Sequence, residues 1–550
     1  MDSLDVNSLT PKVHANGLIG QDTVDWDPGV TYANDSSGVL FSGGLWMSGK
    51  GPMDSLYASC QDYIGNGDHH YEAGPIADQY DSSYIGTYDR VWSISRDSIE
   101  HHANNWWKSG YQAPQMIQEW PGNGDTSNGE AWRLAPFKDL NDNGVYEPQQ
   151  GDRPIIRGDR AIYFMSNDIA GNSADKNPMG IEVHGMIYAW DCQANKALDH
   201  SFFVHYDIIN RSNKSYDSVM VGQFADMDIG CANDDHLGTD VERGLMYTYN
   251  GDSVDQACNG SGYGPYPPAF GMSFLEGPQV DPNGVDDAFQ GPGYGSVNGI
   301  GFNDGSVDNE FFGMQHAYYY NRSGYPAAPM IVSEYFRYMR GRWADGDTIW
   351  HFGGDGTDTS YQGTRFVFPW DSDPQNFATY GSSHGFWSED SAGNAPGDRK
   401  SFATSGPISA GPGDTLELDL AYVAAQDPDT LGAHAPLDEL KARVDTIRQY
   451  YMNDAVPCSD GSFSSMEENE ASFQVSVFPN PSQGRFKIEL KGRNSSYRYE
   501  LYSMRGELLR QGRWRGSGQR SLRLHEQDNG LYFLRIRSEG ESKVLKLMKR

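Results

Sequence analysis

Residues 473–550 place the tightest constraint on what this chain can fold into. Short runs in which apolar and polar side chains alternate are separated there by turn signals rich in Gly, Asn and Pro. Successive side chains of a β-strand point to opposite faces, so Phe486, Ile488 and Leu490 would share one face with basic residues on the other. We therefore predict a small antiparallel β-sandwich over 473–550.

The same stretch differs in charge from the rest of the chain. Residues 471–550 hold 17 Lys and Arg against 7 Asp and Glu, a balance of +10, whereas residues 1–470 carry −43. A basic module behind a strongly acidic body indicates two parts with separate tasks.

The motifs of this module, in their order, resemble a known family. The run VFPNPSQGRF is followed by LYSMRGELL, by NGLYFLRI and by the basic end KVLKLMKR. This order resembles the type A C-terminal sorting domain of the type IX secretion system of Bacteroidetes. The resemblance implies export, with the secretion machinery as the partner of residues 473–550 and an extracellular or outer-membrane surface location. A generic fibronectin-like module is the alternative.

The composition of the 550 residues predicts a mainly β protein. Aromatic residues make up 13%, and 64 Gly and 28 Pro favour many short strands with tight turns. We expect a large, multi-sheet, β-sandwich-like N-terminal region with long loops and one late amphipathic helix at 436–451, where apolar residues recur at helical spacing.

The predicted domain organisation has three parts. An acidic β-rich region covers 1–452, with a candidate subdomain break near 250–300. A Ser- and Glu-rich linker covers 453–472, and the sorting domain covers 473–550.

Charge and hydropathy exclude several classes of partner. A pI near 4.6 argues against nucleic acid, because an acidic surface repels phosphate. No apolar run is long enough to cross a bilayer as a helix.

The polar start MDSLDVNSLTPK does not fit a signal peptide, so we expect a leader that was removed before this numbering begins, or a truncated gene start.

The five cysteines are too few and too scattered for a disulfide scaffold or a CxxC zinc site. We expect Cys231 and Cys258 to pair across an acidic loop, because an exported protein folds in an oxidising compartment.

Residues 138–152, KDLNDNGVYEPQQGD, suggest a calcium loop. Oxygen donors at alternate positions let one loop surround one ion, and Gly144 permits the sharp turn. The EF-hand pattern breaks at Gln150, so the loop would lack an exiting helix and Asp152 would supply the missing carboxylate. An Asn- and Gly-rich turn is the alternative. The expected donors are Asp139, Asn141, Asn143, the carbonyl of Val145, Glu147 and Asp152.

A second acidic stretch, FADMDIGCANDDHLGTD, follows a predicted strand. Carboxylates held close together repel one another unless a cation neutralises them, so calcium is again the expected cofactor. A solvated acidic loop is the alternative, and a magnesium-dependent hydrolase is a remoter one. The expected ligands are Asp226, Asp228, Asp234, Asp235 and Asp240.

The front of the chain also resembles other exported proteins. Segments such as FSGGLWMSG, DLNDNGVYEP, FADMDIG, DNEFFGM and RGRWADG, within residues 35–450, are similar to an uncharacterised group of Bacteroidetes cargo proteins that carry the sorting domain. The resemblance implies no activity.

These observations favour an exported, calcium-stabilised β-protein of the cell surface or medium with an adhesion, matrix or binding role and a glycan or other surface partner. Two alternatives stay open. One is an exported polysaccharide hydrolase, although the sequence has no GxSxG or HExxH motif to identify its chemistry. The other is a non-catalytic glycan-binding protein that uses Tyr and Trp in its long loops.

Overall fold

The chain divides into two compact units. The computed structural model describes residues 1–22, 29–33, 37–64, 70–171, 177–258, 262–288, 297–352, 354–359, 362–458, 463, 473–492, 496–503, 508–515, 518–524, 530–538 and 541–550. The large unit comprises residues 1–101, 114–136 and 156–463, and the small unit comprises 102–113, 137–155 and 464–550.

The large unit contains two broad antiparallel sheets, as a mainly β fold requires. We name them the β15 sheet and the β14 sheet after a central strand of each. The β15 sheet has the order β21 (His316–Asn321), β22 (Arg399–Ala410), β15 (Tyr216–Asp226), β6 (Ser42–Lys50), β3 (Ile19–Gly20), β2 (Leu9–Val13), β4 (Val30–Tyr32) and β5 (Gly38–Leu40), with β1 (Asp2–Ser3) beside β2 and β7 (Leu56–Cys60) beside β6. The β14 sheet has the order β16 (Asp235–Asp240), β17 (Leu245–Asn250), β20 (Ala269–Glu276), β23 (Thr415–Ala425), β14 (Ser201–Asn210), β13 (Ile181–Ala189), β12 (Arg160–Asn167) and β8 (Glu72–Ala73), with β9 (Trp92–Ser95) beside β12.

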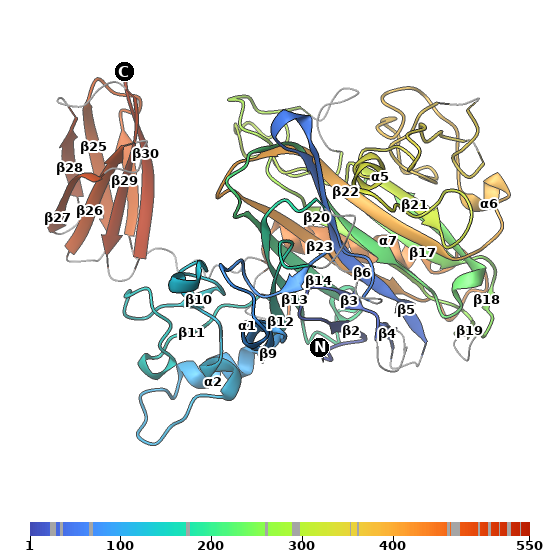
Figure 1. Cartoon of the computed structure of the whole chain (residues 1–550), viewed down its shortest axis with the longest axis horizontal. Coiled ribbons are helices and arrows are strands. Elements are labelled where there is room, and N and C mark those ends of the chain that lie inside the picture. The colour runs from blue at the N-terminus through green and yellow to red at the C-terminus, as the bar shows by residue number, and fades with distance from the viewer. Residues whose placement is uncertain are drawn as a thin grey trace. The chain divides into compact units, whose positions relative to one another are not determined.

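The two sheets form a sandwich with a shared hydrophobic core (Figure 1). Tyr206 of β14 donates a hydrogen bond across the core to Oε1 of Gln223 in β15, at 3.3 Å. The chain before and after residues 250–300 contributes to both sheets, since β15 pairs with β22 in one sheet and β14 pairs with β23 in the other.

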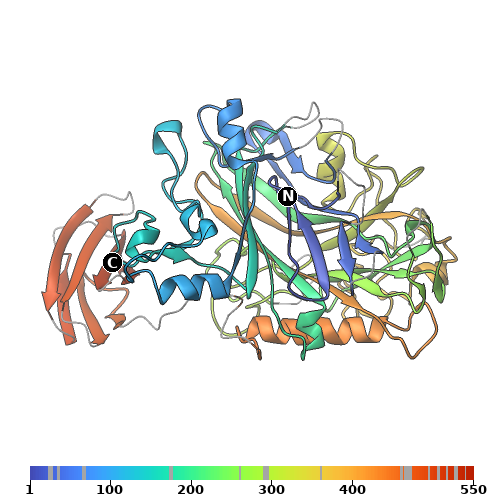
Figure 2. The ribbon, with the colours of Figure 1, turned by 90° about the horizontal axis from the view of Figure 1, so that it is seen from below.

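Helices cover the outer faces of the sandwich. Helix α5 (Val332–Tyr338) packs on β6 and β7 of the β15 sheet, where the Tyr335 and Trp46 rings meet edge to face at 5.1 Å. Helix α7 (Leu437–Met452) packs on β20 and β23 and follows one face of the large unit, where Figure 2 shows it in orange. The late amphipathic helix expected at 436–451 is thus present and lies on the β14 sheet.

Strand β14 is buried on both faces. The alternation of Phe202, Val204, Tyr206 and Ile208 is typical of a half-buried strand, but most residues of β14 on both faces are buried. The outer face carries His205, which bonds with Asp419 of β23 under α7. His205 is therefore buried and paired within the protein rather than solvated, whereas the side chain of Asp207 on the same face is 41% exposed.

Shorter elements complete the large unit or lie at its borders. The remaining helices are α1 (Ser82–Tyr88), α2 (Arg96–Ala103), α3 (Gln115–Gln118), α4 (Lys196–Asp199) and α6 (Glu389–Ala392), and β18 (Val254–Asp255) pairs with β19 (Gly264–Pro265).

Two disulfides join distant segments of the large unit. Cys231 bonds to Cys258, as the sequence predicted, and Cys192 bonds to Cys458, which the sequence did not reveal. Cys60 is a buried free thiol. Within the expected linker 453–472, Cys458 is thus tied to the large unit and the buried Phe463 packs on Trp190. Residues 459–462 and 464–472 of that segment lie outside the described residues.

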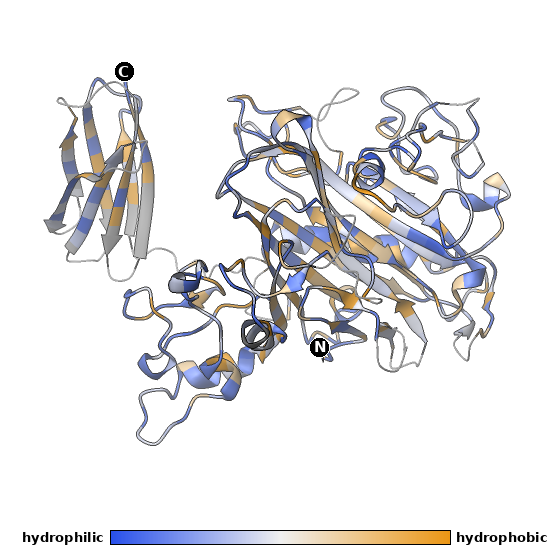
Figure 3. Ribbon diagram, viewed as in Figure 1, coloured by the Kyte–Doolittle hydropathy of each residue, from blue (hydrophilic) through white to orange (hydrophobic). Residues whose placement is uncertain are grey.

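The C-terminal part of the small unit is a β-sandwich, as predicted. Its two sheets have the orders β24 (Phe473–Phe478), β25 (Arg485–Gly492), β28 (Gly518–Arg523) and β27 (Leu508–Arg515), β26 (Ser496–Ser503), β29 (Gly530–Ser538), β30 (Glu541–Lys549). Polar and apolar bands alternate along these strands in Figure 3. Phe486, Ile488 and Leu490 are buried in the core between the sheets.

Candidate functional site

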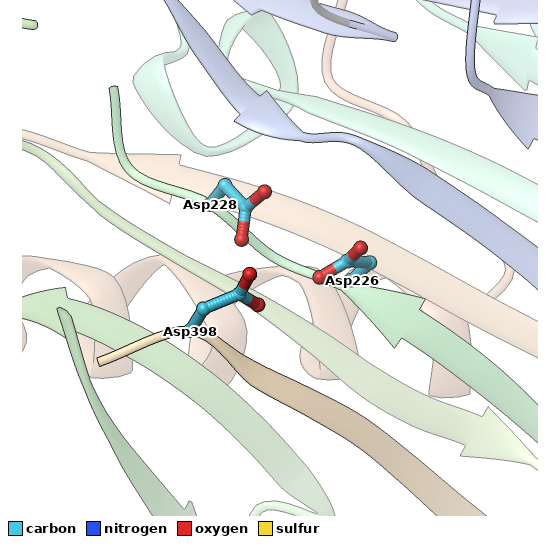
Figure 4. Close-up of side chains that lie close together, drawn as sticks. All are labelled: Asp226, Asp228 and Asp398. Carbon is cyan, nitrogen blue, oxygen red and sulfur yellow. The ribbon is translucent and has the colours of Figure 1, made fainter. Parts of the chain in front are cut away.

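Three carboxylates converge where strand β15 ends and β22 begins. These strands are neighbours, with Ala225 opposite Ser401, so Asp226 and Asp228 lie close to Asp398. One oxygen of each lies within 4.8 Å of the others. Figure 4 shows the three side chains pointing toward one another. We call Asp226, Asp228 and Asp398 the carboxylate cluster.

Lys400 supplies positive charge to this cluster. Its Nζ lies 2.7 Å from both carboxylate oxygens of the buried Asp226 and 2.5 Å from Oδ1 of Asp398. Tyr63 donates a further hydrogen bond to Asp226 at 2.7 Å. Burial raises the pKa of Asp226, and the ammonium of Lys400 opposes that shift. One ammonium thus faces three carboxyl groups, so Lys400 cannot pair with all of them one to one.

Asp228 is the member of the cluster that Lys400 does not bond. Its Oδ1 is buried and has no hydrogen-bond partner among the described residues. Burial, followed by the charge of Asp226, raises the pKa of Asp228 well above its ordinary value. A buried carboxyl group beside another negative charge is stabilised either when it binds a proton or when a cation lies next to it.

The other aspartates that the sequence predicted as ligands beside Asp226 and Asp228 lie outside the carboxylate cluster. Asp235 accepts a hydrogen bond from the N–H of Ile229 at 2.9 Å, and Asp234 accepts one from the N–H of Gln256 at 3.1 Å. Asp240 binds Arg243, with Oδ2 at 2.9 Å from Nη1. The structure therefore brings Asp226 and Asp228 together, and it does not bring Asp234, Asp235 or Asp240 into the same cluster.

Loop 139–152 closes on itself between strands β10 (Phe137–Lys138) and β11 (Arg153–Pro154), which pair with each other. Oδ2 of Asp139 accepts the N–H of Gly144 at 2.7 Å, and Oδ1 of Asn143 accepts that of Val145 at 2.7 Å. Gly144 has a φ of 80°, the left-handed conformation that the sharp turn requires.

Polar side chains of this loop gather on Glu147. Nδ2 of Asn143 lies 2.5 Å from Oε2 of Glu147, and Nδ2 of Asn141 lies 3.4 Å from the same oxygen. The loop thus brings together Asp139, Asn141, Asn143 and Glu147, which the sequence placed in one site.

Asp152 holds the two ends of the loop together. It is fully buried, and its two oxygens accept the N–H groups of Leu140 and Glu147, each at 2.8 Å. Burial raises the pKa of Asp152, and the charges of Asp139 and Glu147 add to the shift. Each of its oxygens has a second lone pair, so these bonds leave room for a cation.

Sequence reasoning missed two residues of the carboxylate cluster. Asp398 and Lys400 lie far from Asp226 along the chain, and they join it only because β22 pairs with β15. The sequence signal that could have found them is the pair DxK at the start of β22, but the partner strand of β22 was not predictable from local pattern.

The small unit matches a known family. Residues 476–550 match the model of the secretion system C-terminal sorting domain. No curated protein matches the chain. A solved structure described as a polysaccharide lyase is 7% identical and aligns over 76% of this chain and 37% of its own length, with a TM-score of 0.19. This chain therefore spans less than half of that protein.

The sorting domain defines the class of this protein. It is a cargo of the type IX secretion system, and such cargo is exported to the cell surface or released. Among the described residues, no helix is both long and apolar enough to cross a membrane.

Proposed function

We propose that this exported protein is stabilised by calcium and has an adhesion, matrix or binding role at the cell surface or in the medium. The match to the sorting domain is the observation that carries the proposal, because it supports export of the acidic large unit out of the cell. The calcium sites and the binding role are the steps that need testing.

Loop 139–152 is our first candidate for the ion. Calcium prefers six to eight hard oxygen ligands, and this loop supplies carboxylate and amide oxygens at alternate positions around a glycine turn. The contacts of Asp139, Asn143 and Glu147 support this, because they hold these side chains within the turn. A calcium ion would also offset the repulsion that Asp139 and Glu147 exert on the buried Asp152.

The carboxylate cluster is the second candidate. Asp226, Asp228 and Asp398 can each offer one oxygen to the same ion. We rank this site below the loop because Lys400 already bonds Asp226 and Asp398. An ion here would sit beside Asp228, the member without a bond to Lys400.

The binding role is supported by the distribution of loops. Long irregular segments on a rigid sandwich are where binding residues usually lie, and the segments 277–315 and 339–388 have few regular elements among their described residues. Their partner would be a surface component or glycan outside the cell.

Export by the tail can be tested in a type IX host. A periplasmic reporter fused to residues 471–550 should reach the cell surface or medium, and the same reporter without them should stay in the periplasm.

Calorimetric titration of the full chain with calcium tests whether the protein binds calcium, and the proposal predicts heat of binding with saturation. A reporter retained in the periplasm contradicts the export step, and a titration without heat contradicts the calcium step.

A further inference from the structure

Lys400 lies against a buried carboxyl group of the neighbouring strand. Because β15 and β22 are antiparallel and Ala225 lies opposite Ser401, Asp226 faces Lys400 across the strand pair. Nζ of Lys400 lies 2.7 Å from each of the two carboxylate oxygens of Asp226. The side chain of Asp226 is 1% exposed and that of Lys400 is 11% exposed, so the amine and the carboxyl group meet with little contact with water.

The contact between Lys12 and Asp22 shows the ordinary form of such a pair. Nζ of Lys12 lies 2.7 Å from one oxygen of Asp22, and the Lys12 side chain is 21% exposed, so its charge is partly solvated. Lys400 and Asp226 are more deeply buried, where two charges lose most of their hydration and the ion pair gains little net stability. An amide between the same two groups would carry no charge and would avoid this desolvation cost.

The other two carboxyl groups of the cluster lie where they can move protons. Oδ1 of Asp398 lies 2.5 Å from Nζ of Lys400. Asp228 points toward Asp226 in Figure 4, and its buried Oδ1 has no hydrogen-bond partner among the described residues. A carboxyl group beside an amine can accept its proton, and one beside an acyl group can donate a proton to the leaving oxygen.

Tyr63 completes the surroundings of the Asp226 carboxyl group. Its hydroxyl donates a hydrogen bond to Oδ2 of Asp226 at 2.7 Å, and such a donor stabilises negative charge that develops on an acyl oxygen. The ring of Tyr63 packs on that of the fully buried Phe224, with 5.4 Å between the centroids. Apolar packing beside the carboxyl group limits the water that could reverse an amide bond.

We propose that Lys400 and Asp226 become joined by an intramolecular amide bond that links β22 to β15. Nζ of Lys400 attacks the carboxyl carbon of Asp226, a C–N bond forms, and one C–O bond breaks. One ammonium and one carboxylate thus give one amide and one water, since two protons of the ammonium leave with the departing oxygen. Asp398 accepts the first proton from Nζ, and Asp228 passes a proton to the leaving oxygen; both end in their starting states.

Contact between the two groups supplies what free amines and carboxylates lack in water. Groups held in reactive contact behave as if at an effective concentration of roughly 10⁵ M or more. The bond would connect segments 174 residues apart in the sequence and would persist under reducing conditions, unlike the two disulfides. It would remove Asp226 as a metal ligand, so it excludes calcium at the carboxylate cluster and leaves loop 139–152 unaffected.

Mass spectrometry of the full chain tests for the bond directly. The protein is reduced to open both disulfides and weighed in excess chelator, so that the result does not depend on calcium. The mass should be lower than the sequence requires by one water, and a protease digest should contain one branched peptide that holds both Asp226 and Lys400. The Lys12–Asp22 pair in the same digest should remain unlinked. A mass equal to that of the sequence, or a digest without the branched peptide, would overturn the proposal.

Variants test the chemistry of the bond. Lys400→Arg keeps a positive charge beside Asp226 but cannot form the amide, so its mass should equal that of its sequence. Asp226→Asn should form the same amide with loss of ammonia instead of water, and its final mass should equal that of the linked wild type. Lys12→Arg is the matched control and should still lose one water. A branched peptide in Lys400→Arg, or an unlinked Lys12→Arg protein, would contradict the assignment.

Discussion

Asp139 and Asp142 lie in the same loop but have different tasks in the proposed calcium site. Asp139 stands at the first ligand position and accepts the N–H of Gly144, whereas Asp142 is exposed at an intervening position with a φ of 55°. Asn tolerates that conformation nearly as well as Asp, so both residues can be changed to Asn without new strain.

Asp139→Asn should therefore lower calcium affinity by about tenfold or more, because affinity in such loops follows the number of charged ligands. Asp142→Asn removes the same charge from the same loop but removes no ligand. It should leave affinity within about threefold of the wild type, because an exposed charge that does not touch the ion acts on it through water. Calorimetric titration measures both. Equal losses in the two variants would mean that the loop attracts calcium only through its overall charge.

The candidate residues were predictable where they lie close together in the sequence. Asp139, Asn141, Asn143 and Glu147 follow a spacing that local geometry turns into one cluster. The five aspartates of 226–240 were only partly predictable, because the backbone between Asp228 and Asp240 turns each side chain toward a different partner. Lys400 could not be foreseen, since it depends on which strands pair.

At the scale of elements, helix α7 docks on a buried charged cluster. Asp419 of β23 binds Nη1 of Arg157 at 2.8 Å and Nδ1 of His205 at 3.0 Å, and it accepts the hydroxyl of Tyr451 of α7 at 2.7 Å. Burial and Arg157 lower the pKa of His205, but the carboxylates of Asp419 and Asp207 outweigh them and raise it to about 9.

This cluster predicts a pH dependence of stability. The folded-state pKa of His205 lies above its unfolded value of about 6.5, so its contribution is complete below pH 6.5 and is lost as the pH rises through about 9. Chemical unfolding at pH 7.5 and 9.5 should show this decline. His205→Gln carries no titrating group and should show a smaller decline over the same range. Identical declines in the two proteins would contradict the role of His205.

The charged cluster also explains why the burial of β14 was not predictable. Alternating apolar residues identify one buried face of a strand, and polar residues on the other face normally indicate solvent. Here His205 is paired with Asp419, which also accepts a hydrogen bond from Tyr451 of α7, an element distant in sequence. Helix α7 itself was predictable, because its apolar stripe recurs at helical spacing.

The disulfide between Cys192 and Cys458 ties the chain that follows α7 to the β14 sheet region. Replacing Cys458 by Ser should lower the free energy of unfolding by about 2–4 kcal/mol, because the cross-link closes a long loop in the unfolded chain. Urea unfolding measures the difference. Cys60→Ala is the control, since Cys60 is buried and free, and it should cost less. A Cys458→Ser protein as stable as the wild type would contradict the structural role of the bond.

At the scale of the whole molecule, composition and alternation were enough to predict a mainly β chain with a basic C-terminal sandwich. The net charge of −43 over residues 1–470 and of +10 over residues 471–550 was enough to separate the sorting domain from the acidic body by sequence alone. The pairing order of the large sheets was not predictable, because β15 pairs with β6 and β22, which lie far from it on either side in the sequence. Long-range pairing is set by the global core rather than by local pattern.

The account depends most on the proposal that calcium binds the folded acidic body. An ion that binds only the folded state adds roughly 2.7 kcal/mol when its free concentration is a hundred times the dissociation constant. Thermal unfolding of the full chain in calcium and in excess chelator measures this directly. We predict a melting temperature several degrees lower in chelator, restored when calcium is added back. Superimposable melting curves with and without chelator would contradict the account.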